Sequence, residues 1–117
     1  MNDFWKNKNV LITGVTGFVG GNLVKKILDS NANIFGIIRN ENPFSYIYLE
    51  GLHNKIRLIN GDLMDHKSLL NLITEQQIDI IFHLAAQVEV GVGLVNPFLT
   101  FETNVRGTYN LMEACRL

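Results

Sequence analysis

Three glycines stand at every third position of the stretch "GVTGFVG", at Gly14, Gly17 and Gly20. An apolar run at residues 10–13 precedes them, and a pattern typical of an amphipathic helix follows. A strand that passes through a glycine-rich turn into a helix aims backbone N–H groups and the positive helix end at one place. The stretch therefore predicts either a cradle for a pyrophosphate or only a tight turn.

The context of the motif favours the cradle. The motif follows a predicted strand, opens a predicted helix and lies in a β-α-β unit of about thirty residues. Gly14 would make the turn, Gly17 would let the ligand approach, and Gly20 would let the helix lie close to the sheet. The candidate cofactor-binding residues of this loop are Gly14, Thr16, Gly17, Phe18, Val19 and Gly20.

The end of the second predicted strand bears on which dinucleotide binds. An acidic residue at this position holds the ribose 2′-hydroxyl, but this sequence has Arg39, followed by Asn40. A guanidinium suits a 2′-phosphate and offers no acceptor to a hydroxyl. We therefore expect Arg39 to favour NADP over NAD, and Asn40 is a further candidate cofactor-binding residue. Glu41 lies close enough to keep NAD open, and a solvated charge at a strand end is the alternative for Arg39.

Apolar runs alternate with helical patterns along the 117 residues. This alternation predicts an α/β fold with a doubly wound parallel sheet, the Rossmann fold. The strands are expected at residues 10–13, 33–38, 55–60 and 79–84, in the spatial order 3-2-1-4. Helices are expected at residues 18–30, at 65–77 with Asp65 as N-cap, and from Asn96-Pro97 to the end of the chain. The sheet would be incomplete, so we expect a partner to supply strands or the chain to be a fragment.

Composition and charge exclude several classes of protein. The formal charge is −1, with 10 basic and 11 acidic residues and no dense basic cluster, so neither nucleic acid nor an anionic membrane is an expected partner. A single cysteine, Cys115, excludes an intrachain disulfide framework and offers no zinc-ligand spacing. No apolar run approaches the roughly eighteen residues that span a bilayer. The expectation is a cytoplasmic protein without a metal site.

Four motifs in order carry a family resemblance: the glycine loop, "NGDLMD", "HLAAQ" and "TFETNVRGTYNLMEACR". With them the chain resembles the N-terminal part of the extended short-chain dehydrogenase/reductase superfamily, specifically the nucleotide-sugar epimerases and 4,6-dehydratases. Its opening is similar to CDP-glucose 4,6-dehydratases, whereas "FGIIRN" is similar to the NADP-using GDP-mannose 4,6-dehydratases. Residues 1–117 would then be the N-terminal part of a dinucleotide-binding Rossmann domain.

The resemblance implies further cofactor-binding residues, which are Asp62, Leu63, Ala85, Ala86, Gln87 and Asn104. The side chain of Asp62 and the backbone of Leu63 would contact adenine, and residues 85–87 would line the pyrophosphate and the nicotinamide ribose. Asn104 would be structural and adjacent to the site. The alternatives are a turn residue for Asp62, close packing for the alanines, and a polar helix face for Asn104.

Neither His83 nor the tyrosines of this chain support a catalytic role. His83 is flanked by Phe82 and Leu84 in a predicted buried strand, so we expect a hydrogen-bonded core histidine. The family resemblance implies acid–base chemistry by a Tyr-x-x-x-Lys pair. This chain has none, because the residues four places after its tyrosines are Glu50, Leu52 and Glu113. No catalytic residue is therefore predicted within it.

The expected parent protein is an NAD(P)-dependent nucleotide-sugar 4,6-dehydratase, and the chain itself is expected to be inactive. Such an enzyme takes hydride from sugar C4, removes water across C5 and C6, and returns hydride to C6. A nucleotide-sugar 4-epimerase and a non-catalytic dinucleotide-binding regulatory module are the alternatives. A homodimer through the helix at residues 98–117 is expected, although the stripe on that helix could equally be buried within the monomer. The stripe consists of Phe98, Phe101, Val105, Met112 and Cys115.

Overall fold

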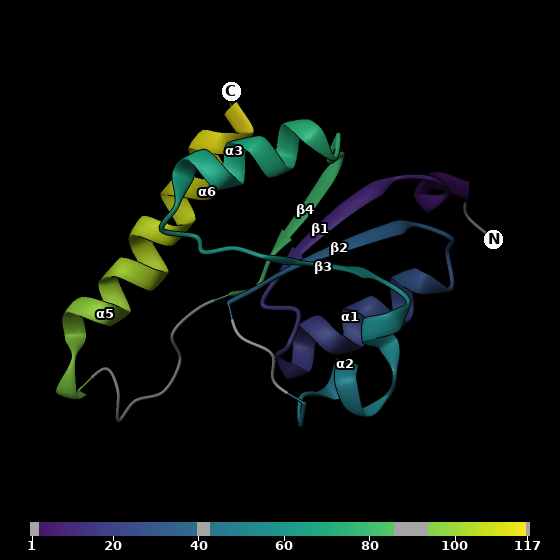
Figure 1. Ribbon diagram of the computed structural model, residues 1–117, viewed down its shortest axis with the longest axis horizontal. Coiled ribbons are helices and arrows are strands. Elements are labelled where there is room, and N and C mark those ends of the chain that lie inside the picture. Colours follow the sequence, from purple (N-terminus) through teal and green to yellow (C-terminus); the bar gives the residue numbers. More distant parts are fainter. Residues whose placement is uncertain (1–2, 40–42, 86–93, 117) are drawn as a thin grey trace.

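The computed structural model describes residues 3–39, 43–85 and 94–116. Its four strands form one parallel sheet in the order β3-β2-β1-β4, which confirms the predicted topology (Figure 1). The strands are β1 (Asn9–Thr13), β2 (Asn33–Ile38), β3 (Arg57–Asn60) and β4 (Ile80–His83). Leu11 of the central strand β1 is in register with Phe35 of β2 and with Ile81 of β4. All four strands therefore end at the same edge of the sheet.

Helices cover the sheet on both faces (Figure 1). On one face lie α1 (Phe18–Leu28) and the short α2 (Tyr46–Leu49). On the other face lie α3 (His66–Glu75) and α6 (Gly107–Arg116), which pack side by side, with α5 (Pro97–Phe101) continuing α6 away from the sheet. A turn of π helix at Glu102–Arg106 joins α5 to α6, and 3-10 turns occur at Asp3–Trp5 and Leu52–Asn54. None of these helices is long and apolar enough to cross a membrane, within the residues described.

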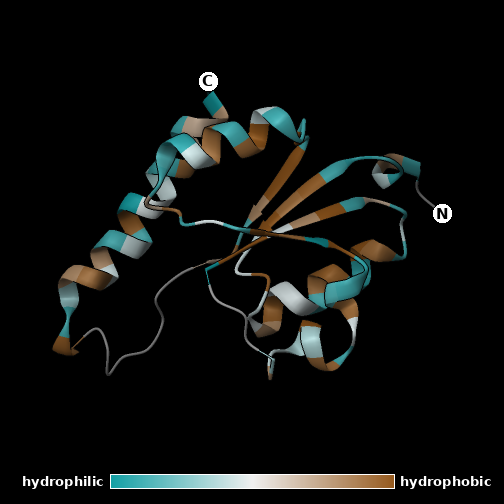
Figure 2. Ribbon diagram, in the orientation of Figure 1, coloured by the Kyte–Doolittle hydropathy of each residue, from teal (hydrophilic) through white to brown (hydrophobic). Residues whose placement is uncertain are grey.

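The hydrophobic core has two parts, one on each face of the sheet. The larger part joins the strands to α1 and α2, and it includes Val10, Ile12, Val24 and Ile27. The smaller part joins α3, α6 and the loop after β3 through Leu63, Leu69, Leu111 and Ala114. Figure 2 shows the corresponding hydrophobic strands, and helices on both sides of the sheet in which hydrophilic and hydrophobic residues are mixed. The two parts together hold the loops at the strand ends in place.

Both predicted helix caps are present. The Asp65 carboxylate accepts hydrogen bonds from the Ser68 backbone N–H at 3.2 Å and from the Ser68 hydroxyl at 2.6 Å. These bonds lower the pKa of Asp65 because they stabilise its charged form. Asn96 caps α5 by accepting from the Leu99 N–H at 3.2 Å, with Pro97 in the first turn. The sequence therefore predicts the starts of α3 and α5 correctly.

The long C-terminal helix differs from its prediction because the π turn divides it. Its apolar stripe was expected either at an interface or within the monomer, and at Phe98 and Phe101 it is exposed. Phe98 is 71% exposed, and Met112, near the other end of the stripe, is 68% exposed. The buried residues of α6 are Gly107, Asn110, Leu111 and Ala114. Two small residues, one amide and one leucine form this face, where α6 packs against α3 and the loop after β3.

Candidate functional site

The glycine turn after β1 is built from backbone contacts that leave no room for side chains. Gly14 has a φ of +72°, a left-handed conformation that L side chains rarely adopt, and an added Cβ would lie 2.7 Å from the Leu84 carbonyl carbon. A Cβ on Gly20 would lie only 2.2 Å from the Gly14 carbonyl oxygen. Gly20 therefore lets the helix approach the turn itself, and not the sheet as predicted.

The start of α1 offers hydrogen-bond donors to a ligand. Gly17 is the N-cap residue and has no side chain that could accept from the first turn. Helical geometry leaves the N–H groups of Phe18, Val19 and Gly20 without an acceptor inside the helix. The positive end of the helix dipole is at the same place. Phe18 and Val19 are 79% and 64% exposed, so this end of the helix is open to solvent.

An open pocket of about 910 Å³ lies at the carboxyl ends of the strands, next to the glycine turn. Ligands of open α/β sheets bind at this edge, where the strand order reverses. The predicted residues that line the pocket are Gly14, Thr16, Gly17, Phe18, Val19, Gly20, Arg39, Asp62, Leu63 and Ala85. Asn104 is not among the lining residues, and Asn40, Ala86 and Gln87 lie outside the described part of the chain.

One wall of the pocket was not anticipated from the sequence. Leu99 of α5 and the first two residues of the π turn, Glu102 and Thr103, face the glycine loop across the pocket. The motif that contains Asn104 therefore lies at the site, but Glu102 and Thr103 form the wall and Asn104 does not line it. A π turn inside a helix is a frequent feature of functional sites, and helical periodicity alone does not predict it.

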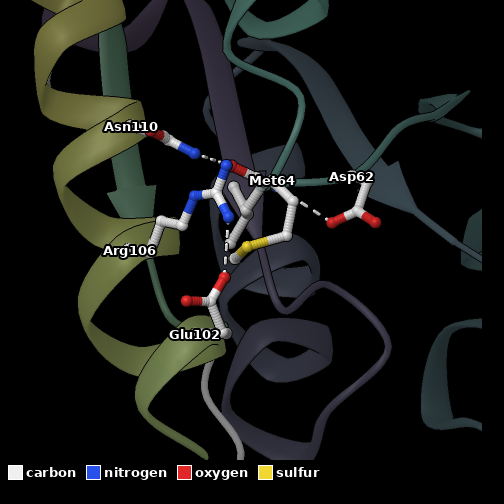
Figure 3. A network of polar contacts seen from close by, with 6 residues as sticks. Asp62, Met64, Glu102, Arg106 and Asn110 are labelled. Atoms are coloured by element: carbon white, nitrogen blue, oxygen red, sulfur yellow. Dashed lines mark hydrogen bonds and ion pairs between the residues drawn. The ribbon is translucent and has the colours of Figure 1, made fainter. Parts of the chain in front are cut away.

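The loop after β3 is fixed from two sides, as Figure 3 shows. Asp62 Oδ1 accepts from the Met64 N–H at 3.0 Å, and the buried amide of Asn110 donates to the Leu63 carbonyl at 2.9 Å. Both polar groups of the Leu63–Met64 peptide are therefore engaged, which sets the direction of the Asp62 carboxylate. Asp62 Oδ2 lies 4.0 Å from Arg39 Nε, with the two side chains 46% and 66% exposed.

His83 is a hydrogen-bonded histidine, as expected, although it is half-buried rather than fully enclosed. Its Nδ1 lies 2.7 Å from the Thr13 hydroxyl, and its Nε2 lies 3.0 Å from the Thr108 hydroxyl. Burial lowers the pKa of His83, because a desolvated ring disfavours the charged form. No cluster of three or more metal-ligating side chains occurs among the residues that the structure describes.

This fold and this glycine turn define a Rossmann-like α/β protein. A sequence profile of the GDP-mannose 4,6-dehydratase family matches residues 11–117. The chain belongs to the extended short-chain dehydrogenase/reductase family of nucleotide-sugar epimerases and dehydratases, and it corresponds to the nucleotide-binding N-terminal region of that family.

Individual relatives support the same placement. GDP-mannose 4,6-dehydratase of Sordaria araneosa is 32% identical over 115 residues, 98% of this chain and 21% of that protein. CDP-glucose 4,6-dehydratase of Salmonella typhimurium is 32% identical over 115 residues, 97% of this chain and 32% of that protein. The UDP-glucose 4-epimerase of Thermus thermophilus, solved with NAD, superposes with a TM-score of 0.78 at 29% identity, covering 92% of this chain and 33% of that one. The chain thus spans about a third or less of the length of these relatives.

Proposed function

We propose that the pocket beside the glycine turn binds NAD(P), and that the chain is the cofactor-binding part of a nucleotide-sugar 4,6-dehydratase. The observation that carries the proposal is the convergence of ten sequence-predicted residues on one pocket at the start of α1. The cradle fits a pyrophosphate because the first-turn N–H groups of α1 have no acceptor inside the helix and the N-cap, Gly17, places no side chain beside them. A volume of about 910 Å³ is also within the usual size range of ligand pockets.

Each part of the pocket has a proposed role. The first-turn N–H groups of α1 hold the pyrophosphate, and Asp62 and the Leu63 backbone contact adenine. Ala85, just after β4, would line the nicotinamide side. A bound nicotinamide would supply the hydride chemistry, taking hydride from sugar C4 and returning it to C6. The described residues bind and orient, whereas proton transfer and the sugar-nucleotide site are proposed to belong to a further part of the protein.

Calorimetric titration of the 117-residue chain with NADP⁺ and with NAD⁺ tests this function. We expect saturable binding of a dinucleotide at one site and no turnover of GDP-mannose or CDP-glucose. Absence of saturable binding of either dinucleotide would contradict the proposed function. Turnover by this chain alone would contradict the proposed division between cofactor binding and proton transfer.

A nucleotide-sugar 4-epimerase is the second candidate, and the structural likeness to the Thermus thermophilus UDP-glucose 4-epimerase favours it. Both reactions begin by removing hydride from C4, so the cofactor pocket serves either. The product formed by the complete protein separates them. A 4-keto-6-deoxy sugar supports the dehydratase, and a C4 epimer without loss of water supports the epimerase.

We predict that Arg39→Asp lowers affinity for NADP⁺ much more than affinity for NAD⁺. The pair with Asp62 is long and exposed, so it contributes little and leaves the guanidinium able to turn toward a 2′-phosphate. Loss of such a charge-assisted hydrogen bond weakens NADP⁺ binding on the order of 10- to 100-fold. The ratio of the two calorimetric Kd values measures the effect.

Lys55→Asp is the matched control, because it changes the net charge equally at an exposed residue that does not line this pocket. It is expected to leave the ratio of the two Kd values unchanged. An Arg39→Asp chain that binds NADP⁺ as tightly as the natural sequence would refute the role of Arg39 and the preference for NADP.

We also propose that the chain forms a homodimer through residues 98–117. The exposed apolar stripe of α5 and α6 supports this, since Phe98 and Phe101 are 71% and 67% exposed on the same helical segment. Phe98→Glu combined with Phe101→Glu is expected to shift sedimentation from dimer to monomer. Leu49→Glu is the control, because Leu49 is 67% exposed on α2, across the sheet. A natural sequence that sediments as a monomer would contradict the dimer.

A further inference from the structure

A line of hydrogen bonds crosses the protein beneath the pocket and joins four elements, which are β1, β4, α6 and the π turn. It runs from the Thr13 hydroxyl at the end of β1 to His83 Nδ1, over 2.7 Å, and from His83 Nε2 to the Thr108 hydroxyl of α6, over 3.0 Å. The Thr108 hydroxyl then donates to the Asn104 carbonyl of the π turn, over 2.7 Å. His83 is the middle of this line and the only ring in it.

The Thr13 end of the line determines the proton on His83. Thr13 Oγ1 accepts from the Leu84 N–H at 3.0 Å and from the Ala85 N–H at 3.1 Å. A hydroxyl has two lone pairs, so these two bonds use its accepting capacity and leave its proton to donate. The proton therefore goes to His83 Nδ1, which must be unprotonated.

The Thr108 end leads independently to the same tautomer. The Thr108 proton is engaged with the Asn104 carbonyl, so the hydroxyl oxygen faces His83 as an acceptor. His83 Nε2 must then carry the hydrogen and donate it. The two ends agree on a neutral ring protonated at Nε2, which is also the charge state that burial favours.

One end of the line lies in the pocket wall, and the other end lies in the π turn next to it. Thr13, Leu84 and Ala85 line the pocket at the strand ends, and Glu102 and Thr103, which directly precede Asn104 in the π turn, also line it. The π turn is closed by a bond from the Gly107 N–H to the Glu102 carbonyl, one residue longer than the α-helical spacing. The hydroxyl of Thr108 supports this irregular turn by engaging its Asn104 carbonyl from the side.

We propose that His83 is a positioning residue that couples the two sides of the dinucleotide pocket, through Thr13 to the backbone at Leu84 and Ala85 and through Thr108 to the π turn. The proposal rests on the proposed function for the pocket itself. His83 itself is not among the residues that line the pocket. It fixes the distance between the strand ends and the wall that carries Glu102 and Thr103, so that both present a preformed surface.

The tautomer of His83 in the natural 117-residue chain is the first test, and it needs no substitution. Long-range ¹H–¹⁵N correlation spectra are expected to show a hydrogen on Nε2 and an unprotonated Nδ1. A ring protonated at Nδ1, or a mixture of tautomers in exchange, would overturn the proposal.

Substitution of Thr108 is the second test. Thr108→Val removes the hydroxyl at nearly constant shape, and it is expected to move the amide resonances of Leu84 and Ala85, on a different element. It is also expected to weaken binding of NADP⁺ about three- to ten-fold, as for one lost hydrogen bond. Thr108→Ser should restore both properties. Thr74→Val, the same change on the exposed part of α3, should alter neither.

These readouts separate the coupling from the function on which it rests. If the natural chain binds no dinucleotide, the proposed function fails, while the tautomer and the resonances of Leu84 and Ala85 still decide whether the coupling exists. A folded Thr108→Val chain with unchanged Leu84 and Ala85 resonances would overturn the coupling. If Thr108→Val does not fold, the tautomer of His83 in the natural chain decides whether the coupling exists.

Discussion

Gly20→Ala is expected to lower the free energy of unfolding by about 1–3 kcal/mol, the usual cost of forcing extra volume into a packed site. At an ordinary helical position the same change stabilises by roughly 0.5–1 kcal/mol. At Gly20 the change destabilises the fold instead, because the new Cβ would lie 2.2 Å from the Gly14 carbonyl oxygen and 3.0 Å from the Val15 Cα. Both atoms belong to the backbone, so the loop or α1 must move. Urea denaturation measures the difference.

Gly17→Ala is the matched control for this effect. Its Cβ would meet only the Gly14 carbonyl oxygen, at 3.3 Å, and its φ of −79° is open to alanine. We expect stability within about 1 kcal/mol of the natural sequence. Binding of a dinucleotide should still weaken on the order of ten-fold, because the methyl group displaces the phosphate from first-turn N–H donors. A Gly20→Ala chain as stable as Gly17→Ala would contradict the packing role of Gly20.

Asn110→Asp is expected to destabilise the fold by about 2–4 kcal/mol, the cost of a buried and unpaired charge. Asn110 is 8% exposed, and its amide donates to the Leu63 carbonyl. A carboxylate of the same shape would instead face that carbonyl oxygen and repel it. Because this bond holds the loop that carries Asp62, dinucleotide affinity should fall as well. Thermal denaturation and calorimetric titration of the same sample measure both effects.

Asn22→Asp is the matched control, because it makes the same chemical change at an exposed residue. The Asn22 amide also donates to a backbone carbonyl, that of Phe18 at 2.8 Å, but the residue is exposed on α1. A change within about 0.5 kcal/mol is expected, as for surface substitutions in general. Equal losses in the two variants would show that burial of Asn110 is not what makes its hydrogen bond important.

The parts of the fold that local chemistry determines could be read from the sequence. The strand order follows from alternating apolar runs and right-handed crossovers, and Gly14 adopts the positive φ that a glycine turn after a strand requires. The cap at Asp65 follows from its position before a helical pattern. Ten of the proposed site residues meet in one pocket because parallel strands bring their carboxyl ends together.

The C-terminal helix could not be read in the same way. The apolar pattern predicts the stripe through Phe98 and Met112 without deciding whether it is an interface or part of the core, and it does not predict the buried face. That face contains Gly107, Asn110, Leu111 and Ala114. Close helix packing selects small side chains, and a hydrogen-bonded amide is as acceptable there as an apolar group. The π turn adds one residue to the repeat, which rotates everything after it relative to a regular helix. Asn104 therefore lies beside the pocket, and Glu102 and Thr103 line it.

The central claim is that the glycine turn and the start of α1 hold the pyrophosphate of a dinucleotide. Amide chemical shifts of the ¹⁵N-labelled chain during titration with NADP⁺ test it most directly. We predict saturable shifts at Gly14, at residues 17–20 and at Leu63. Shifts that do not saturate, or that gather at the opposite end of the sheet around Asn33, Arg57 and Gln76, would contradict the claim.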